Sequence, residues 1–297
     1  MQHSTGILVV GQVARDLVLG IEGMPEGGGS AEVRERREML GGKGANQAVG
    51  LIQLGASVRM LGVVGDDETD SFVLEQARAD GIDVEHVIRR GTTALLLDIV
   101  EADGTRRLFE DVPESALLTA DDIRAHESAF DGVDTVILQL QQPTDALLAA
   151  AELARDRGIR LVLDGAIEGP ERDRLLGLAD VLRADATEAS ILTGVELGSR
   201  DDAKRAAIEL LAKGPSLVAV AVPGQGDLVV WDGGEVFTPL GDEEVVDPTG
   251  AGDAFVAGLV TGLRAGHGQQ HSAELAHAAA GATVTRLGGR PDLTGLR

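Results

Sequence analysis

The sequence predicts an α/β fold, a doubly wound and mostly parallel sheet flanked by helices. Short apolar runs recur along the 297 residues, and segments with helical spacing of apolar residues separate them. Most runs are continuously apolar rather than alternating, which is typical of strands buried on both faces of a parallel sheet. The 40 glycines are scattered at the ends of these segments, where tight turns require them. Strands and helices are therefore expected to alternate.

The elements follow one another in a regular order. Strands are predicted at 7–11, 58–65, 135–140, 161–164, 217–222 and 228–231. Helices are predicted at 45–54, 70–80, 121–129, 144–157, 187–192, 201–212, 254–265 and 272–286. No internal repeat or linker rich in proline and serine interrupts them, so we expect one domain over residues 1–297.

Two segments break the alternation. Residues 15–40 are rich in glycine and then strongly charged, and residues 93–111 hold two runs around an Asp-Gly turn, typical of a hairpin. Such segments form either an exposed antiparallel flap or ordinary edge hairpins. We expect a small protruding β-sheet, in which the charged run 32–38 is a solvated face.

The composition excludes several classes of partner and site. With 26 Lys and Arg against 49 Asp and Glu, the net charge is −23. Nucleic acids and anionic membranes are bound by clustered cations, so neither is expected as a partner. The absence of cysteine excludes disulfides, thiolate metal ligands and a cysteine nucleophile. We see no leader at the N-terminus and no apolar run long enough to span a membrane, and we expect a cytoplasmic protein.

The first chemical motif is Asp-Pro-Thr-Gly-Ala-Gly-Asp-Ala-Phe at residues 247–255, before a predicted helix. Gly250 and Gly252 lack Cβ atoms, so several backbone N–H groups can face one anion at the start of the helix. Asp253 in the same turn is a poor phosphate ligand but is suited to take a proton from a hydroxyl nucleophile. The alternative is a glycine-rich turn in which Asp253 caps the helix.

The second motif is Gly-Gly-Lys-Gly-Ala-Asn-Gln-Ala at residues 41–48, again before a predicted helix. Its spacing is not that of a Walker A loop. Lys43 and Asn46 could instead donate hydrogen bonds to a polyol. The alternative is a glycine-rich helix start with a solvated lysine.

Together the two motifs resemble those of the ribokinase-like (PfkB-type) carbohydrate kinases. Weaker matches at 62–67, 138–140, 187–194 and 284–286 follow in family order, so the resemblance spans nearly the whole chain. It implies a ribokinase-like fold with a β-sheet lid that often forms a homodimer contact. It also implies ATP-dependent transfer of the γ-phosphoryl group to a primary hydroxyl of a small sugar, with ribose as the expected acceptor, Mg²⁺ as cofactor, and K⁺ as an open question.

The resemblance assigns roles to individual residues. Asp253 would be the general base, and the amides of Gly250, Ala251 and Gly252 would form the anion hole. The sugar would be held by Asp16, Gly42, Lys43, Asn46, Gln141 and Asp247. ATP and Mg²⁺ would be held by Asp185, Glu188, Gly224, Gly226 and His277, with His277 near the adenine. A monovalent cation would lie beside Asp247, Thr249 and the backbone carbonyls around Arg286–Gly288, with Asp292 nearby.

The chain departs from the family pattern at several positions. Ala14 replaces an asparagine and Gln141 a glutamate, which removes hydrogen-bonding capacity or charge from the sugar pocket. Asp185 replaces the asparagine of the Asn-x-x-Glu motif and adds a negative charge near ATP. The nucleotide loop at 223–226 reads Pro-Gly-Gln-Gly and lacks the family's serine hydroxyl. Asp292 replaces a small polar residue.

These departures keep two alternatives open. One is a kinase for another polyhydroxy acceptor, such as fructose, a sugar acid or a nucleoside. The other is a catalytically silent protein that binds a nucleotide or a sugar, although such a binder has no need of the aspartate retained at position 253.

Overall fold

The computed structural model describes residues 6–66 and 68–296, without the side chains of 68–70. The first five residues, part of the segment in which no leader was expected, lie outside this description. So does Asp67, the last residue of the family match at 62–67. The main sheet has eight strands in the order β14-β13-β12-β11-β10-β9-β1-β4. Neighbours from β4 to β12 run parallel, whereas β13 and β14 are antiparallel additions at one edge. The predicted doubly wound, mostly parallel sheet is confirmed.

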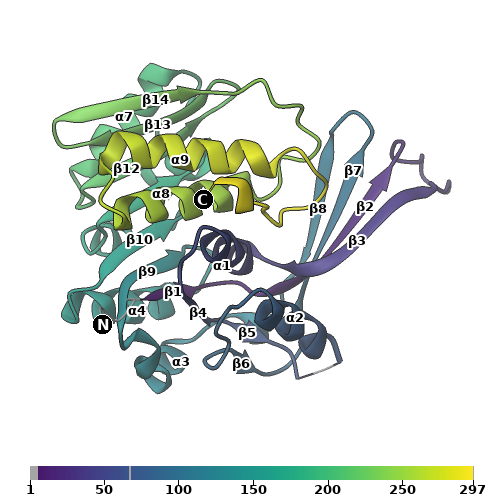
Figure 1. Cartoon of the computed structure of the whole chain (residues 1–297), viewed down its shortest axis with the longest axis horizontal. Helices are drawn as coiled ribbons and strands as arrows, with labels where there is room; N and C mark the ends of the chain where they lie inside the picture. The colour runs from purple at the N-terminus through teal and green to yellow at the C-terminus, as the bar shows by residue number, and fades with distance from the viewer. Residues whose placement is uncertain (1–5, 67, 297) are drawn as a thin grey trace.

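The strands of this sheet are β1 (Gly6–Val10), β4 (Val58–Leu61), β9 (Val133–Gln139), β10 (Arg160–Asp164), β11 (Val181–Ala184), β12 (Leu217–Val222), β13 (Gly226–Trp231) and β14 (Gly234–Pro239). One face is covered by α1 (Lys43–Gln53), α2 (Glu68–Ala79), α8 (Ala251–Arg264) and α9 (Gly268–Thr283) (Figure 1). The other face is covered by α3 (Ala120–Ala125), α4 (Thr144–Asp156), α5 (Arg172–Leu176), α6 (Ala186–Thr193) and α7 (Arg200–Leu211). Short 3₁₀ turns lie at Glu114–Ala116, Glu127–Phe130 and Thr294–Leu296.

Two hydrophobic cores explain why the strands are apolar throughout. In β1, Ile7 and Val9 contribute to the core under α1 and α8, whereas Leu8 and Val10 contribute to the core under α4. Successive side chains of a strand point to opposite faces. A strand covered by helices on both sides must therefore be apolar at every position.

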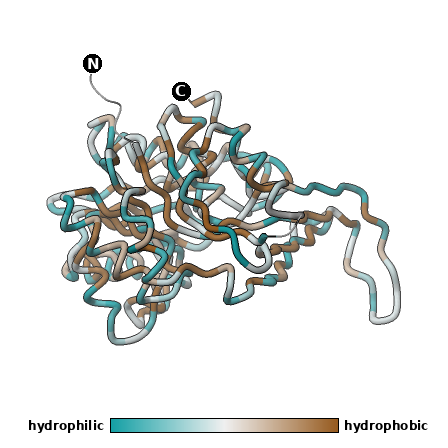
Figure 2. Tube along the Cα trace, turned by 90° about the horizontal axis from the view of Figure 1, so that it is seen from below, coloured by the Kyte–Doolittle hydropathy of each residue, from teal (hydrophilic) through white to brown (hydrophobic). Residues whose placement is uncertain are grey.

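A second sheet projects from the main body (Figures 1 and 2). Its order is β3-β2-β7-β8, formed by β2 (Ala14–Ile21), β3 (Val33–Gly41), β7 (Ala94–Glu101) and β8 (Arg106–Asp111). β2 and β7 are parallel neighbours at its centre, and β3 and β8 are antiparallel to them at the edges. The two segments that break the alternation thus join in one small sheet, called the projecting sheet below.

Several predicted boundaries were wrong. The predicted strand 58–65 is interrupted at Gly62, after which β5 (Val63–Val64) leaves the main sheet and pairs with β6 (Ile88–Arg89). The chain passes so close to β1 here that a Cβ on Gly62 would lie 2.6 Å from the carbonyl oxygen of Gly11. The predicted helix 121–129 ends early and continues as a 3₁₀ turn, and the predicted helix 272–286 is shifted to Gly268–Thr283.

None of the helices in the described part of the chain is both long and apolar enough to cross a bilayer.

Candidate active site

Polar residues lie at or next to the carboxyl ends of three neighbouring strands of the main sheet. Asp164, the last residue of β10, is paired in register with Gln139 of β9 and Arg183 of β11. The edge formed by the carboxyl ends of parallel strands is where open α/β sheets bind ligands. Side chains of α1 and backbone of α8 close over this row, as described below.

Asp253 lies in the first turn of α8 and is buried, with 6% of its surface exposed. Its Oδ2 accepts a hydrogen bond from Nδ2 of Asn46 at 3.3 Å, and its Oδ1 accepts one from Nε2 of Gln47 at 3.1 Å. Burial and the charge of Asp164 raise the pKa of Asp253 to about 7. The N-cap of α8 is Gly250, so the alternative role of Asp253 as the cap is excluded.

Gln47 connects Asp253 to the polar row. Its Nε2 also donates to Oδ2 of Asp164 at 2.8 Å, and its Oε1 accepts from Nε2 of Gln139 at 2.8 Å. Gln139 in turn accepts from the backbone N–H of Gln12 at 3.1 Å. Because every member is buried, this network fixes the orientation of the Asp253 carboxyl group.

The turn before α8 is built from the first motif. Gly250 has φ +77°, and a Cβ there would overlap the carbonyl oxygen of Gly289, so only glycine fits. Oδ1 of the buried Asp247 accepts from N and Oγ1 of Thr249 at 2.9 and 2.5 Å, and its Oδ2 accepts from N of Gly288 at 2.8 Å. Asp247 therefore holds the loop. No side chain caps α8, which leaves N–H groups at the helix start for an anion.

A second set of charges lies beside the turn. Nζ of Lys43 donates to Oε1 of Glu188 at 2.9 Å, and Nη1 of Arg183 lies 3.2 Å from Oδ1 of Asp164 and 3.5 Å from Oε2 of Glu188. Burial by itself lowers the pKa of Lys43, but the carboxylates of Asp164 and Glu188 outweigh it and hold that pKa above its usual value. Both cations thus remain charged next to the anion turn.

Asp16 of β2 forms the opposite wall of the site. It is 2% exposed, and its Oδ1 has no hydrogen-bond partner in the described structure. Burial and the carboxylate of Asp98 raise the pKa of Asp16 to about 7. Asp98, from β7, is itself paired with Arg106 of β8 at 2.5 Å. A buried oxygen without a partner is costly unless a ligand supplies a donor, so this wall suits a ligand with hydroxyl groups.

A cavity of about 360 Å³ opens on the other side of the anion turn. Gly224 and Gly226 line it, together with Gly252, Arg183 and His277. The nearby Asp227 carboxylate, whose Oδ2 is 3.5 Å from Nδ1 of His277, raises the pKa of that histidine. The five predicted nucleotide and Mg²⁺ residues therefore divide between this cavity and the start of α6.

Asp185 and Glu188 start α6 with a capping box. N of Asp185 donates to Oε2 of Glu188 at 2.7 Å, and N of Glu188 donates to Oδ1 of Asp185 at 2.8 Å. Oδ2 of Asp185 accepts no hydrogen bond from the described residues. A carboxylate oxygen of this kind is the ligand that Mg²⁺ prefers, so these residues fit that ion.

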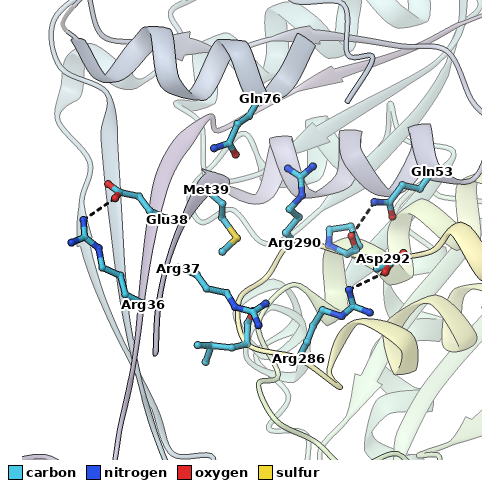
Figure 3. A pocket seen from close by; sticks show the side chains of 11 residues that line it. Arg36, Arg37, Glu38, Met39, Gln53, Gln76, Arg286, Arg290 and Asp292 are labelled. Carbon is cyan, nitrogen blue, oxygen red and sulfur yellow. Dashed lines mark hydrogen bonds and ion pairs between the residues drawn. The ribbon is translucent and has the colours of Figure 1, made fainter. Parts of the chain in front are cut away.

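The side chains of the predicted monovalent-cation set are engaged with their neighbours. Oδ2 of Asp292 accepts from Nη1 of Arg286 at 2.9 Å (Figure 3). Its Oδ1 accepts from Oγ1 of Thr294 at 2.9 Å. Both oxygens of Asp247 are used by the loop, and the hydroxyl of Thr249 donates to Asp247. The prediction also rests on the backbone carbonyls around Arg286–Gly288, so the K⁺ site stays a prediction, and no step is routed through K⁺.

The Arg286–Asp292 pair lines a cavity of about 650 Å³ between the projecting sheet and the C-terminal loop (Figure 3). Three more arginines line it, and each is paired with a carboxylate: Arg36 with Glu38, Arg37 with Glu35, and Arg290 with Asp80. The four cations are therefore balanced by four nearby carboxylates.

The structure brings most of the predicted residues together, whereas Gln141 stays a prediction. Gln141 is exposed and makes no hydrogen bond within the described residues, whereas its neighbour Gln142 is buried and accepts from N of Leu118 at 2.9 Å. Sequence reasoning missed Gln47, Asp164 and Arg183. A charged residue inside or at the end of an apolar run was the available signal for the last two.

Comparison with known proteins shows the family to which the chain belongs. Residues 4–294 match the model of the pfkB family carbohydrate kinases. Ribokinase of Haemophilus influenzae is 27% identical over 97% of this chain and 94% of its own length. An ATP-dependent ribose-1-phosphate kinase of Halopiger xanaduensis is 29% identical over 96% and 93%. A bifunctional ribokinase/ribose-5-phosphate isomerase A of Fructilactobacillus sanfranciscensis is 29% identical over 86% of this chain, which spans only 48% of that protein.

Among solved structures, ribokinase of Thermotoga maritima superposes with a TM-score of 0.82, at 25% identity, over 96% of this chain and 95% of that one. Three findings lead to one conclusion: the family match covers nearly the whole chain, the fold is ribokinase-like, and the Gly250–Asp253 turn forms an anion site next to a buried aspartate. The chain belongs to the pfkB family of carbohydrate kinases and is a phosphotransferase that acts on a sugar.

Proposed function

We propose that this protein is an ATP-dependent sugar kinase that phosphorylates a primary hydroxyl group, with ribose as the first acceptor to test. One observation carries the proposal. Asp253, buried and with a pKa of about 7, lies at the uncapped start of α8, between the wall formed by Asp16 and the cavity beside Gly252. A proton acceptor and an anion-binding turn are thus adjacent, as phosphoryl transfer to an alcohol requires.

The acceptor would lie between Asp16, Gly42, Lys43 and Asn46. Asp253 takes the proton of its hydroxyl group while that oxygen forms a bond to the γ-phosphorus, and the bond between the γ-phosphorus and the β,γ-bridging oxygen breaks to release ADP. The amides of Gly250, Ala251 and Gly252 stabilise the charge on the phosphoryl oxygens. Gln141, exposed here, remains a predicted sugar contact.

The nucleotide would occupy the cavity of about 360 Å³. Its base lies toward His277 and its phosphates toward Gly224, Gly226 and the anion turn. Mg²⁺, held through Asp185 and Glu188, neutralises phosphate charge when it is bound. The small apolar side chains of the cavity, such as Ala280 and Val284, suit a flat base.

The projecting sheet would act as a lid over the sugar. Asp16 and Asp98 lie on one of its faces, and both are buried, so a shift of this sheet changes the access of water to the site. Exclusion of water favours transfer to the sugar over hydrolysis of ATP. We also propose that the enzyme is a cytoplasmic homodimer.

The test compares the wild type with Asp253→Asn. We expect ribose-dependent release of ADP from Mg-ATP by the wild type, and a loss of about 10³-fold or more in kcat for the variant, with ATP affinity retained. Near-normal turnover by a folded Asp253→Asn protein would overturn the assignment of the base.

The acceptor is tested on a panel under the same conditions. It contains ribose, deoxyribose, ribose 1-phosphate, fructose, a sugar acid and adenosine, since Ala14 and Gln141 depart from the ribokinase pattern. Turnover with one of the other compounds instead of ribose would identify that compound as the acceptor and leave the proposed phosphoryl transfer unchanged. ATP binding without turnover on any of them would favour the silent binding protein.

A further inference from the structure

Arg183 lies directly against the anion turn, and no predicted role accounts for it. If Gly252 carried a Cβ, that atom would lie 2.5 to 2.8 Å from Nη2, Cζ and Nη1 of Arg183. The guanidinium plane therefore rests on the backbone of the turn. Arg183 and Gly252 line the same cavity of about 360 Å³, which places a permanent cation where the phosphate groups of a nucleotide would meet the turn.

Only one end of the guanidinium is engaged. Nη1 faces Asp164 and Glu188, at 3.2 and 3.5 Å, whereas Nη2 and Nε make no hydrogen bond within residues 6–66 and 68–296. The side chain is 12% exposed. Arginine presents five donors in a fixed fork that matches phosphate oxygens. The donors that remain can serve an anion in the cavity.

The carboxylates around the cavity are a second reason to expect a cation in the nucleotide site. Asp185 adds a carboxylate near the nucleotide, and the loop at 223–226 has Gly224 where the family has a serine hydroxyl. Asp164 and Glu188 bring further negative charge, and each of these carboxylates disfavours a polyphosphate. Lys43 balances part of it on the sugar side. Arg183 is the corresponding cation on the nucleotide side.

We propose that Arg183 is a catalytic residue that binds the γ-phosphate of ATP through Nη2 and Nε. The proposal rests on the proposed kinase function and extends it. As the sugar oxygen bonds to phosphorus and its proton passes to Asp253, negative charge moves onto the phosphoryl and leaving-group oxygens. Arg183 stabilises this charge beside the amide of Gly252. Asp164 is a positioning residue that holds the guanidinium through Nη1.

The test measures nucleotide affinity by calorimetry without any sugar, using Mg-ATP, Mg-ADP and AMP. For Arg183→Gln we expect affinity for ATP to fall about tenfold or more, as for the loss of a charged hydrogen bond, with ADP affected less and AMP within about twofold of wild type. In the complete reaction, kcat falls about 10²-fold or more while KM for the sugar changes little.

Removing Arg183 alone leaves Asp164 buried without its partner and can destabilise the fold. The variant Arg183→Gln/Asp164→Asn removes both charges and should show the same selective loss for ATP. Arg264→Gln is the matched control, because Arg264 forms a two-point pair with Asp134 at 2.8 Å near the opposite end of α8. It should bind all three nucleotides like the wild type.

The outcomes separate this inference from the proposed function. If the wild type does not bind Mg-ATP, the proposed function fails. If the wild type binds it and the double variant binds ATP equally well, only the role of Arg183 fails. An equal loss for ATP and AMP would show a purely structural role and also overturn the inference.

Discussion

Two buried carboxyl groups, Asp16 and Asp253, have pKa values of about 7 in this fold. Burial is the largest cause for both, and neighbouring carboxylates add to it: Asp98 for Asp16, and Asp164 for Asp253. A base whose pKa is close to the working pH is both deprotonated and basic enough to accept a proton. The same burial that makes Asp253 useful makes its charged form costly.

The raised pKa of Asp253 predicts the pH dependence of turnover. The base must be ionised, so kcat/KM should fall about tenfold per pH unit below a pKa of about 7 and be level above it. Profiles of kcat/KM from pH 5.5 to 9 measure this. Because Asp16 titrates in the same range, Asp16→Asn serves as the control and should keep the inflection. An inflection near pH 4 would contradict the prediction.

The raised pKa of Asp16 predicts a pH dependence of stability. A carboxyl group whose pKa rises from 3.8 to about 7 on folding keeps its proton up to a higher pH in the native state than in the unfolded state. Its contribution to the free energy of unfolding therefore falls as pH rises through this window. Relative to wild type, Asp16→Asn should gain about 2–4 kcal/mol between pH 4.5 and pH 8.

Urea unfolding of both proteins at the two pH values measures this gain. Titrations of groups that do not interact with Asp16 cancel in the difference, whereas Asp98 and Asp253, which interact with it, contribute to the gain. A constant difference between Asp16→Asn and wild type would show that Asp16 is already ionised at low pH in the native state.

At the scale of single residues, the sequence motifs predicted Asp253, Asn46 and Gly250 as site residues but not Asp164 or Arg183. The motif residues are close in sequence to the turn or helix start that needs them. Asp164 and Arg183 come from different strands, and only the register of β10 with β11 makes them neighbours. Register depends on the packing of the whole sheet, which a local pattern does not report.

At the scale of elements, helix α6 shows that the aspartate at position 185 still caps the helix. Asp185, which replaces the family's asparagine, accepts from N of Glu188 at 2.8 Å, and its own N donates the return bond to Oε2 of Glu188 at 2.7 Å. The capping box holds Glu188 where it pairs with Lys43 at 2.9 Å. The departure is therefore compatible with a well-formed helix start, because aspartate and asparagine are comparable N-caps.

This comparison predicts different results for two variants of Asp185. Asp185→Asn keeps the cap, so its unfolding free energy should stay within about 0.5 kcal/mol of wild type, whereas Asp185→Ala should lose about 1 kcal/mol. Calorimetry or urea unfolding distinguishes them. Equal losses for the two variants would show that charge at this position, and not the cap, stabilises α6.

Long periodic elements were predictable and short ones were not. Helices such as α4 and α7 were found nearly to their ends, because three or more turns repeat the same apolar spacing. The four residues of β11 contain Arg183, and β14 (Gly234–Pro239) is half exposed, so neither shows a continuous apolar run. The early end of β4 depends on the close approach of Gly62 to Gly11, a contact between distant segments.

At the scale of the molecule, the projecting sheet has two unlike faces. Asp16 and Asp98 lie on the face toward the site. The register places Leu17 and Leu97 side by side on the opposite face, with Phe109 next to Leu97. Leu95 and Ile99 share this outer face, whereas Leu108, opposite Asp98, lies on the inner one. In a single chain the helices cover the main sheet on both sides but leave this outer face open, with its apolar centre on β2 and β7 and charged residues such as Glu38 and Arg107 on the edge strands.

An open apolar face of this kind predicts that two chains associate through it. Phe109 is 51% exposed, and so is Ile208 on α7, which makes Ile208→Glu a matched control for Phe109→Glu. Light scattering after size exclusion should show a dimer for wild type and Ile208→Glu, and a monomer for Phe109→Glu. If the partner steadies the sheet over the sugar, the monomer should also have a higher KM for the sugar at unchanged ATP affinity. A wild type that is monomeric at micromolar concentration would contradict the prediction and leave the outer face to another partner.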